Sequence, residues 1–348
     1  KNFITLISGT IGTYIFPILF SPFLTRIYSP DDGRKMGLMG MIHDLMGTAS
    51  KVDLISSERL STLNSPITPA NMAEVGLLLT LSESASAEDF SAIIQKVSSS
   101  EKEVPVIGFT GTGGAGKSSL LDELMLRILR DNPDKKICLL CVDPTRKRTG
   151  GALLGDRIRM NSIRSPRVYM RSLATRQANL ALSAHVNDAI NILKAANFDL
   201  IILETSGIGQ SDTEIVEHSD ISMYCMTPDY GAATQLEKID MLDFADIIAL
   251  NKFDKKGSED AFRDIRKQWR RNRVEFEIED EKVPVFRTIA SQFNDPGVSY
   301  VFKNLCGLIS NKCMTEEQQW VPILELDTIE PKATVLLPGK KIRYLAEI

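Results

Sequence analysis

Between about residues 104 and 290, short apolar runs alternate with stretches whose apolar residues recur at helical spacing. The helical spacing is clearest in residues 118–130, where one apolar stripe contains Leu120, Leu121, Leu124, Met125 and Ile128. The apolar runs are interpreted as strands and read VPVIGFTG, KKICLLCVD, FDLIILETSG, ISMYCMTP, ADIIALNKFD and VPVFRTIA. Continuous apolar strands separated by amphipathic helices predict an α/β fold, with a mostly parallel sheet covered by helices on both faces.

The segments on either side of this alternating region follow other patterns. Residues 3–24 carry no charged side chain and are long enough to span a bilayer. A buried strand followed by a glycine loop explains this run equally well, so both interpretations stay open. Residues 48–100 are rich in Ser, Ala and Glu and predict a helical linker, with helices over 69–79 and 87–97. After about residue 312 the chain becomes Pro-rich and irregular, which predicts a second linker.

These patterns divide the chain into four predicted segments. Because the chain begins at Lys1 rather than Met and stops within GKKIRYLAEI, we expect a piece of a longer protein. The predicted segments are an N-terminal segment 1–47, a helical linker 48–100, the sheet domain 101–312 and a C-terminal linker 313–348.

Composition and charge change this picture little. A chain of 348 residues with 43% hydrophobic and 25% charged residues is typical of a globular protein of about two domains. The net charge of −4 gives no reason to expect nucleic acid, and the basic stretch at residues 263–273 is interpreted as a solvated helix face. Five cysteines are too few for a disulfide framework, which indicates a reducing compartment such as the cytoplasm. We interpret Cys138 and Cys141 as two buried side chains, because residues three apart on a strand face opposite sides.

The first chemical motif is GTGGAGKS at residues 111–118, which has the pattern G-x-x-x-x-G-K-[ST]. It lies between a predicted strand and a predicted helix, as a phosphate-binding loop does. Its glycines let successive backbone N–H groups turn inward around phosphates, and the helix that follows adds its partial positive end. Lys117 can reach the β- and γ-phosphates, and the Ser118 hydroxyl can ligate magnesium.

Two acidic residues follow at predicted strand ends. Asp143 ends KICLLCVD, and Glu204 follows the apolar run LIIL. In an open parallel sheet, ligands bind beyond the carboxyl ends of the strands, so both carboxylates are expected near the phosphate loop. Magnesium takes oxygen ligands and keeps several waters, so one or two carboxylates suffice. Each residue alone has the alternative interpretation of a helix cap.

The second motif, NKFD at residues 251–254, ends the predicted strand ADIIAL. A carboxylate at Asp254 can accept hydrogen bonds from N1–H and the exocyclic amine of guanine, and adenine has no such pair of donors. The Asn251 amide can contact the base edge or tie loops together, and the Lys252 stem can cover the ring. Residues 288–291 (TIAS) end the next predicted strand and can complete the base site through backbone N–H groups.

The ordered set GTGGAGKS, VDPTRKRTGGALLGDRIRM, ETSGIGQSDTE and NKFD resembles the SIMIBI class of GTPases with a P-loop. More narrowly, it is similar to the GTPases that chaperone adenosylcobalamin-dependent acyl-CoA mutases. Two subfamilies share the pattern, the free-standing methylmalonyl-CoA-mutase-associated GTPase and the fused isobutyryl-CoA mutase. The flanking TRIYSPDDGRKMGLMGMI resembles the end of a cobalamin-binding domain, and KKIRYLAEI resembles the start of a mutase domain, which favours the fused form.

The resemblance implies a role for each matching residue. The stretches TGGALLGDRIRM and GIGQSDTE would be switch loops. The implied nucleotide contacts are Gly113, Gly114, Ala115, Gly116, Lys117, Ser118, Arg159, Asn251, Lys252, Phe253 and Asp254. The implied magnesium ligands lie among Ser118, Asp143, Asp156, Glu204 and Thr205.

The chain also departs from the fused pattern. The cobalt-ligating motif D-x-H-x-x-G is absent, and His43 in IHDLMG is interpreted as a surface helix histidine. Residues 1–23 match neither the cobalamin-binding nor the GTPase portion and resemble the N-terminus of polysaccharide flippases. We therefore expect adenosylcobalamin and acyl-CoA mutase domains only as partners, in the same longer chain or in a separate subunit, and no mutase activity from this chain alone. A homodimer is also expected.

The expected reaction is in-line attack of water on the γ-phosphate of GTP, with Mg²⁺ and the loop amides stabilising charge. No side chain stands out as a general base, and Gln210 in GIGQ can orient the water or serve a structural role. The catalytic candidates are Lys117, Glu204 and Gln210. Slow intrinsic turnover is expected, raised by a partner that orders the switch loops, so that hydrolysis gates cofactor loading.

Three other functions remain to be distinguished. A P-loop kinase for a small molecule would use the same phosphate loop but has no need for NKFD, and it would prefer ATP. A nickel-delivering GTPase needs thiol or imidazole ligands, and the histidines are His43, His185 and His218. A membrane-associated role would depend on residues 3–24.

Overall fold

The computed structural model describes residues 35, 40–41, 43–44, 67–84, 103–144, 159–175, 185–205, 212–313, 320, 322–323 and 330–331. The chain divides into two compact units, Lys1–Leu63 and Asn64–Ile348. In the first unit, the described residues are helical, and His43 is exposed there, which confirms the predicted surface helix histidine. The apolar run 3–24 and the predicted helix 87–97 lie outside the described residues.

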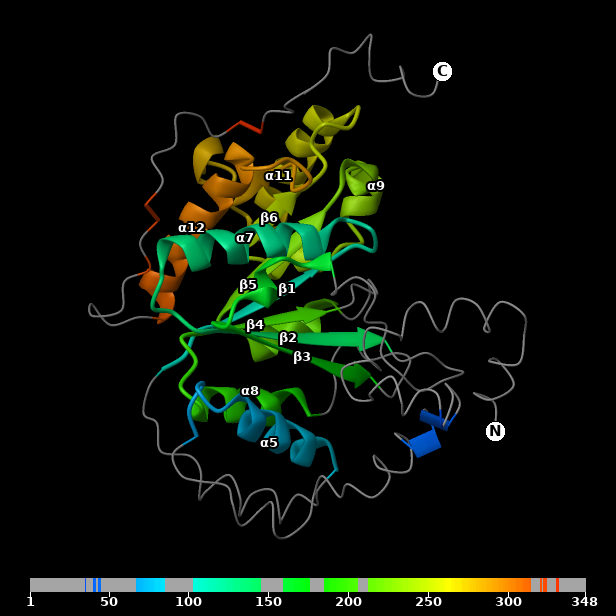
Figure 1. Ribbon diagram of the computed structural model, residues 1–348. Coiled ribbons are helices and arrows are strands. Elements are labelled where there is room, and N and C mark those ends of the chain that lie inside the picture. The colour runs from blue at the N-terminus through cyan, green and yellow to red at the C-terminus, as the bar shows by residue number, and fades with distance from the viewer. Residues whose placement is uncertain are drawn as a thin grey trace. The chain divides into compact units, whose positions relative to one another are not determined.

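The second unit is built on a seven-stranded sheet in the order β3-β2-β4-β1-β5-β6-β7, and every described pairing is parallel (Figure 1). The central strands β1, β4 and β5 are buried at every position, as their uninterrupted apolar sequences predict. The parallel α/β fold predicted from the sequence is therefore confirmed. The strands are β1 Val106–Gly111, β2 Ile137–Pro144, β3 Val168–Thr175, β4 Leu200–Thr205, β5 Ile221–Met226, β6 Ile247–Leu250 and β7 Val285–Arg287.

Strand β3 was missed by the sequence analysis. Its sequence VYMRSLAT places Arg171 and Ser172 in the middle of the strand, which breaks the apolar run that marked the other strands. The strand lies at the edge of the sheet and pairs only with β2 in the described part of the chain. At an edge, a polar side chain can find partners beside the sheet, and Arg171 Nη2 donates a hydrogen bond of 3.2 Å to Thr80 Oγ1.

Helices cover both faces of the sheet. Helices α7, Lys117–Asp131, and α12, Pro296–Cys313, pack together on one face, where Leu120, Leu124 and Phe302 belong to the main core. The predicted helix 118–130 is thus confirmed as α7. The remaining helices and 3₁₀ turns are η2 Ser162–Arg164, α8 Val186–Ala195, η3 Asp212–His218, η4 Pro228–Tyr230, α9 Ala233–Leu236, α10 Met241–Phe244, α11 Ser258–Arg273 and η5 Asp280–Lys282.

Helix α5, Met72–Ser84, packs against α8 (Figure 1). A surface helix was predicted over residues 69–79, and the helix is present, but one of its sides is buried through Val75, Leu78 and Leu79. These apolar side chains exclude water where α5 meets the rest of the second unit. The helix is therefore an integral layer of this unit.

The chain returns to the core after α12. Trp320 is buried among the core side chains, and Lys135 Nζ lies 5.4 Å from the centre of its ring. The backbone N–H of Ile323 donates to Asp131 Oδ2 at 3.1 Å, at the last residue of α7. The region predicted as a linker thus begins with residues that pack on α7.

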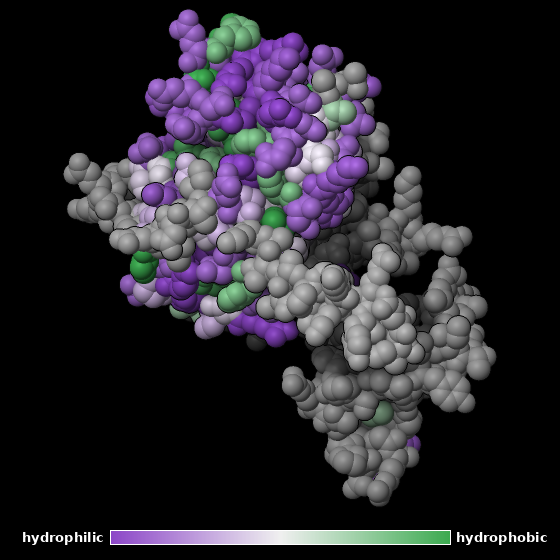
Figure 2. Space-filling model, turned by 90° about the horizontal axis from the view of Figure 1, so that it is seen from above, coloured by the Kyte–Doolittle hydropathy of each residue, from purple (hydrophilic) through white to green (hydrophobic). Residues whose placement is uncertain are grey.

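The remaining predictions about surface and core concern α11 and the cysteines. Figure 2 views the side that carries α11, and hydrophilic side chains dominate the described surface there. Arg266 and Arg270 of this helix form ion pairs with Asp280. Cys138 and Cys141 are free and buried, as predicted, and only Cys141 joins the core on the α7 side. In the described part of the chain, no helix is both long and apolar enough to cross a membrane.

Candidate functional site

The sequence motifs meet at one edge of the sheet, because all strands are parallel and end on the same side. The phosphate-loop sequence follows β1, Glu204 and Thr205 end β4, and NKFD follows β6. In the register of the sheet, Glu204 of β4 pairs with Phe109 of β1 on one side and with Cys141 of β2 on the other. A ligand site beyond the carboxyl ends of the strands is where this class of fold binds nucleotides.

Glycines set the path of residues 111–118. Gly111, Gly114 and Gly116 have φ angles of 149°, 71° and 88°, which favour glycine over other residues. A Cβ atom on Gly111 would lie 1.9 Å from the carbonyl oxygen of Cys225 in β5, so the close approach of the two strands requires glycine here. Helix α7 begins directly after this turn, at Lys117, so its unpaired N–H groups face the loop.

Lys117 and Ser118 stand at the start of α7 and face different partners. Lys117 is 9% exposed, and its Nζ donates to the carbonyl oxygens of Gly111 and Thr112 at 2.8 and 3.1 Å. Ser118 Oγ donates a 3.3 Å hydrogen bond to Glu204 Oε1. The side chain of Glu204 is 1% exposed. The structure therefore brings together a hydroxyl and a carboxylate, the type of oxygen donors that magnesium prefers.

The other predicted metal ligands differ in what the structure shows. Thr205 Oγ1 donates to Thr110 Oγ1 at 2.6 Å, so this hydroxyl is directed at the neighbouring strand β1. Asp143 lies in β2 at the same edge of the sheet, but its side chain is outside the described part of the structure. Asp156 and Gln210 lie outside the described residues, as do most residues of both predicted switch loops. Arg159 is described and is exposed.

Asn251 joins the two motifs. Its Nδ2 donates to the carbonyl oxygen of Ala115 at 2.8 Å, and its Oδ1 accepts the backbone N–H of Ala290 at 3.0 Å. Thr288 Oγ1 also donates to Oδ1, at 3.3 Å. The residue is 2% exposed, so these bonds form away from water. Asn251 therefore ties the phosphate loop to residues 288–291, one of the two roles predicted for it.

The rest of NKFD is held beside the phosphate loop. Lys252 Nζ donates to the carbonyl oxygen of Gly114 at 2.8 Å, so its stem crosses the loop. The backbone N–H of Phe253 donates to the carbonyl oxygen of Thr288 at 3.1 Å. Asp254 is exposed and forms no hydrogen bond or ion pair with the described residues. Its carboxylate is thus available to a ligand at the edge of the site.

Charged and thiol groups near these loops have shifted pKa values. Burial raises the pKa of Cys225 to about 12, and its thiol lies 3.8 Å from the carbonyl oxygen of Ala115. The thiol therefore stays protonated beside the phosphate loop at neutral pH. The pKa of Asp229 is lowered because Lys255 Nζ donates to it at 2.6 Å. This bond connects the segment after β5 with the segment after NKFD.

Two buried carboxylates near the site were not found from the sequence. Asp122 of α7 accepts the backbone N–H groups of Asn161 and Ser162 at 2.9 and 2.8 Å, which fixes the chain directly after Arg159 and Met160. Asp295 accepts the backbone N–H of Ile289, next to Ala290, at 3.1 Å. The sequence Asp-Pro at a helix start is a known capping signal, but nothing local predicts the bond to Ile289.

Comparison with known proteins identifies relatives of this arrangement. The family described as methylmalonyl Co-A mutase-associated GTPase MeaB matches residues 75–310. A fused isobutyryl-CoA mutase of Geobacillus kaustophilus is 50% identical over 337 residues, which cover 93% of this chain and 30% of the relative. A protein of Pyrococcus horikoshii named as a GTPase is 36% identical over 218 residues, covering 62% of this chain and 68% of the relative. The chain thus spans less than a third of the fused mutase that it matches.

Among solved structures, a LAO/AO transport system kinase superposes with a TM-score of 0.52 and 20% sequence identity. The superposition covers 74% of this chain and 76% of that protein. At this identity the likeness concerns the fold, and it agrees with the parallel sheet and phosphate loop described above.

Proposed function

Because the chain belongs to the family of methylmalonyl-CoA-mutase-associated GTPases, we propose that it binds and hydrolyses GTP with Mg²⁺. We propose further that hydrolysis gates the loading of cofactor onto an adenosylcobalamin-dependent acyl-CoA mutase of the fused isobutyryl-CoA type. The observation that carries the nucleotide proposal is the pair of bonds from Asn251 to Ala115 and Ala290. These bonds support the proposal, because they tie the loop that would hold the phosphates to the segment that would hold guanine.

Guanine selection would depend on two groups of donors and acceptors. The Asp254 carboxylate would accept from N1–H and the 2-amino group, and this carboxylate has no competing partner among the described residues. Within residues 288–291, the N–H groups of the first three residues are bonded inside the protein. The backbone N–H of Ser291 would therefore donate to the 6-oxygen of guanine. Adenine carries an amino group at position 6 and lacks the N1–H, so neither contact would form with it.

Magnesium fits the donor set at Ser118 and Glu204. Their oxygens are 3.3 Å apart, and the carboxylate is buried, so a divalent cation would compensate its charge. Bound there, the ion would supply neutralisation of charge on the β- and γ-phosphoryl oxygens. Asp143 and Asp156 stay proposed ligands, and Thr205 would have to turn from Thr110 to join them.

The chain's own residues would contribute position and charge to the reaction. Lys117 Nζ donates to the carbonyl oxygens of Gly111 and Thr112, so its side chain lies over the loop. On binding, Lys117 would exchange these carbonyls for phosphate oxygens, and the loop amides would donate to the same oxygens. We propose Gln210 as the residue that orients the attacking water and Arg159 as a further nucleotide contact.

The proposed partner is a mutase with its cobalamin-binding domain. The support is the family match together with fused relatives that are more than three times as long as the matched region. We accordingly propose the organisation given by the sequence, with a G domain at residues 101–312 and a segment 313–348 that leads to a mutase domain. A cytoplasmic location and a homodimer belong to the same proposal.

The test is isothermal titration of the purified chain with GDP and with ADP, each with Mg²⁺ and with EDTA. We expect heat of binding for GDP with Mg²⁺, weaker binding in EDTA, and little or none for ADP. Hydrolysis of GTP is then followed as phosphate release with and without a mutase of the fused isobutyryl-CoA type. No binding of GDP would overturn the proposal, and preference for adenine nucleotides would favour the kinase alternative. Hydrolysis that does not respond to the mutase would remove the chaperone role alone.

A further inference from the structure

Asp295 lies under residues 288–291 and contacts them from the protein interior. It is 1% exposed and directly precedes α12. Its Oδ2 accepts the backbone N–H groups of Ile289 at 3.1 Å and Val298 at 2.9 Å. One carboxylate oxygen therefore holds both the loop after β7 and the first turn of α12.

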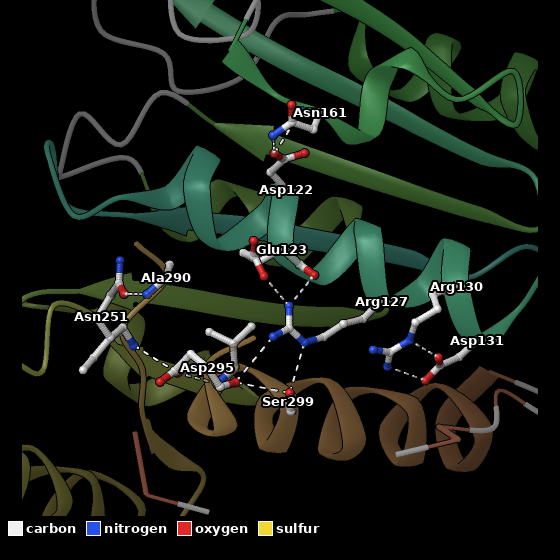
Figure 3. Close-up of polar contacts among 12 residues, drawn as sticks. Asp122, Glu123, Arg127, Arg130, Asp131, Asn161, Asn251, Ala290, Asp295 and Ser299 are labelled. Carbon is white, nitrogen blue, oxygen red and sulfur yellow. Dashed lines mark hydrogen bonds and ion pairs between the residues drawn. The ribbon is translucent and has the colours of Figure 1, made fainter. Parts of the chain in front are cut away.

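Arg127 of α7 fixes the other side of this residue (Figure 3). Its Nη2 donates to the carbonyl oxygen of Asp295 at 3.4 Å, and its Nε donates to Ser299 Oγ at 3.2 Å. The guanidinium is 4% exposed and forms an ion pair with Glu123 at 2.6 Å. A buried Arg with its donors satisfied in this way has little freedom to move.

These contacts complete a ring of bonded segments. Ala115 belongs to the phosphate loop, which continues without a break into α7 and Arg127. Arg127 is hydrogen-bonded to Asp295, and Asp295 is hydrogen-bonded to Ile289. The residue after Ile289, Ala290, is hydrogen-bonded to Asn251. Asn251 returns to Ala115, which closes the ring. A closed ring of this kind restrains the loop at residues 288–291 from two sides.

We propose that Asp295, held by Arg127, is a positioning residue for base selection, which rests on the proposed binding of guanine nucleotides. The N–H groups of Thr288, Ile289 and Ala290 are bonded to Leu250, Asp295 and Asn251. Asp295 thereby fixes the direction of the next N–H along the loop, that of Ser291, which would read position 6 of the base. A hydrogen bond weakens steeply as its angle departs from linearity, so a small rotation of the loop removes discrimination at that position. The phosphate loop and Asp254 would retain their own contributions to binding.

The competing explanation is that Asp295 only caps α12. The bonds from Val298 to Oδ2 and from Ser299 to the backbone oxygen are those of an ordinary N-cap. Serine is as good an N-cap as aspartate, but its single, shorter hydroxyl cannot serve the same two N–H groups. Asp295→Ser therefore preserves the cap of α12 while it releases Ile289. Asp295→Asn is the conservative variant, because its amide oxygen can still accept both N–H groups.

The experiment measures the ratio of the dissociation constants of ADP and GDP, with Mg²⁺, for the full chain and both variants. We expect Asp295→Ser to lower this ratio about tenfold, which corresponds to one misaligned buried hydrogen bond, and Asp295→Asn to keep most of it. Asp246→Asn is the matched control, because Asp246 Oδ2 also accepts a backbone N–H, that of Ser222 at 2.9 Å. This bond lies at the amino ends of β5 and β6, away from the candidate site. The control should keep the ratio of the unmodified chain.

Amide hydrogen exchange of the nucleotide-free chain provides a readout independent of binding. The N–H groups of Ile289 and Ala290 should exchange at least about tenfold faster in Asp295→Ser, while Val298 keeps its protection. A high ratio in the unmodified chain that stays unchanged in Asp295→Ser would overturn this inference and leave the proposed function intact. Unchanged exchange at Ile289 would also overturn it. A ratio near one in the unmodified chain would remove guanine selection and this inference together.

Discussion

The side-chain nitrogen of Asn251 donates a 2.8 Å hydrogen bond to the backbone oxygen of Ala115, although the two residues are 136 positions apart in sequence. The same side chain accepts the N–H of Ala290. Two loops that would contact opposite ends of a nucleotide therefore share one buried amide. Damage to this amide should affect stability even when no nucleotide is present.

Asn251→Ala should lower the free energy of unfolding of the nucleotide-free protein by about 2 kcal/mol or more, because the Ala115 oxygen and the Ala290 N–H both lose a buried partner. Urea unfolding measures this change. Asn187→Ala is the control, since Asn187 is exposed and its side chain bonds only the half-buried His218 among the described residues. Its change should stay within about 0.5 kcal/mol. Equal effects of the two substitutions would contradict the role of Asn251.

Gly116→Ala should lower the free energy of unfolding, because it disturbs the contact between the phosphate loop and Asn251. Gly116 has a φ of 88°, and a Cβ atom there would lie 2.6 Å from Asn251 Nδ2. We expect a loss of about 1–2 kcal/mol from backbone strain, and an additional loss as Asn251 is displaced. In contrast, Gly307 lies on an exposed turn of α12 with nothing within 4 Å of an added Cβ. Gly307→Ala should stabilise by about 0.5–1 kcal/mol, so opposite signs in thermal unfolding are the test.

Asp254→Asn should shift the base preference of the nucleotide site from guanine to xanthine. Xanthine has an oxygen where guanine has its 2-amino group, so the amide nitrogen of the new side chain can donate to it. We expect the affinity for GDP to fall at least about tenfold and that for xanthosine diphosphate to rise. Asp260→Asn, in the exposed first turn of α11, is the control. A variant with unchanged selectivity for GDP would exclude Asp254 from base recognition.

Cys225 should make stability depend on pH in the alkaline range. Its pKa is raised from 9.0 to about 12 by burial, so the thiol is protonated in both states below pH 9. Above pH 9 the unfolded chain ionises first, and the free energy of unfolding falls by about 1.4 kcal/mol per pH unit for this group until the folded pKa is reached. Cys225→Ala should flatten that slope in urea unfolding between pH 9.5 and 11 under reducing conditions. Parallel slopes would contradict this assignment.

The features predicted from sequence are those whose physical cause is local. The buried strands appear as unbroken apolar runs, and α7 as a stripe at helical spacing. GTGGAGKS specifies its own turn, since Gly114 and Gly116 both adopt positive φ angles. The sequence left two roles open for Asn251, and its bonds to Ala115 and Ala290 show the tie between loops.

The features that were missed depend on distant partners. Strand β3 has a polar interior that is compatible with an edge position, and its edge position follows from the whole strand order. Asp295 bonds Ile289 and Asp122 bonds Ser162 because the fold brings these segments together. A local signal can mark a helix cap such as Asp295, but no periodicity or motif marks the bond of a carboxylate to a distant segment.

The burial of α5 against α8 has a practical consequence for cutting the protein into pieces. A recombinant fragment starting at Val104 would look complete by motif, yet it would lose Val75, Leu78 and Leu79 from the surface of α8. The newly bared apolar area would favour self-association in solution. A fragment that begins at Asn64, where the second unit starts, keeps this cover, and we expect it to self-associate less than the fragment from Val104.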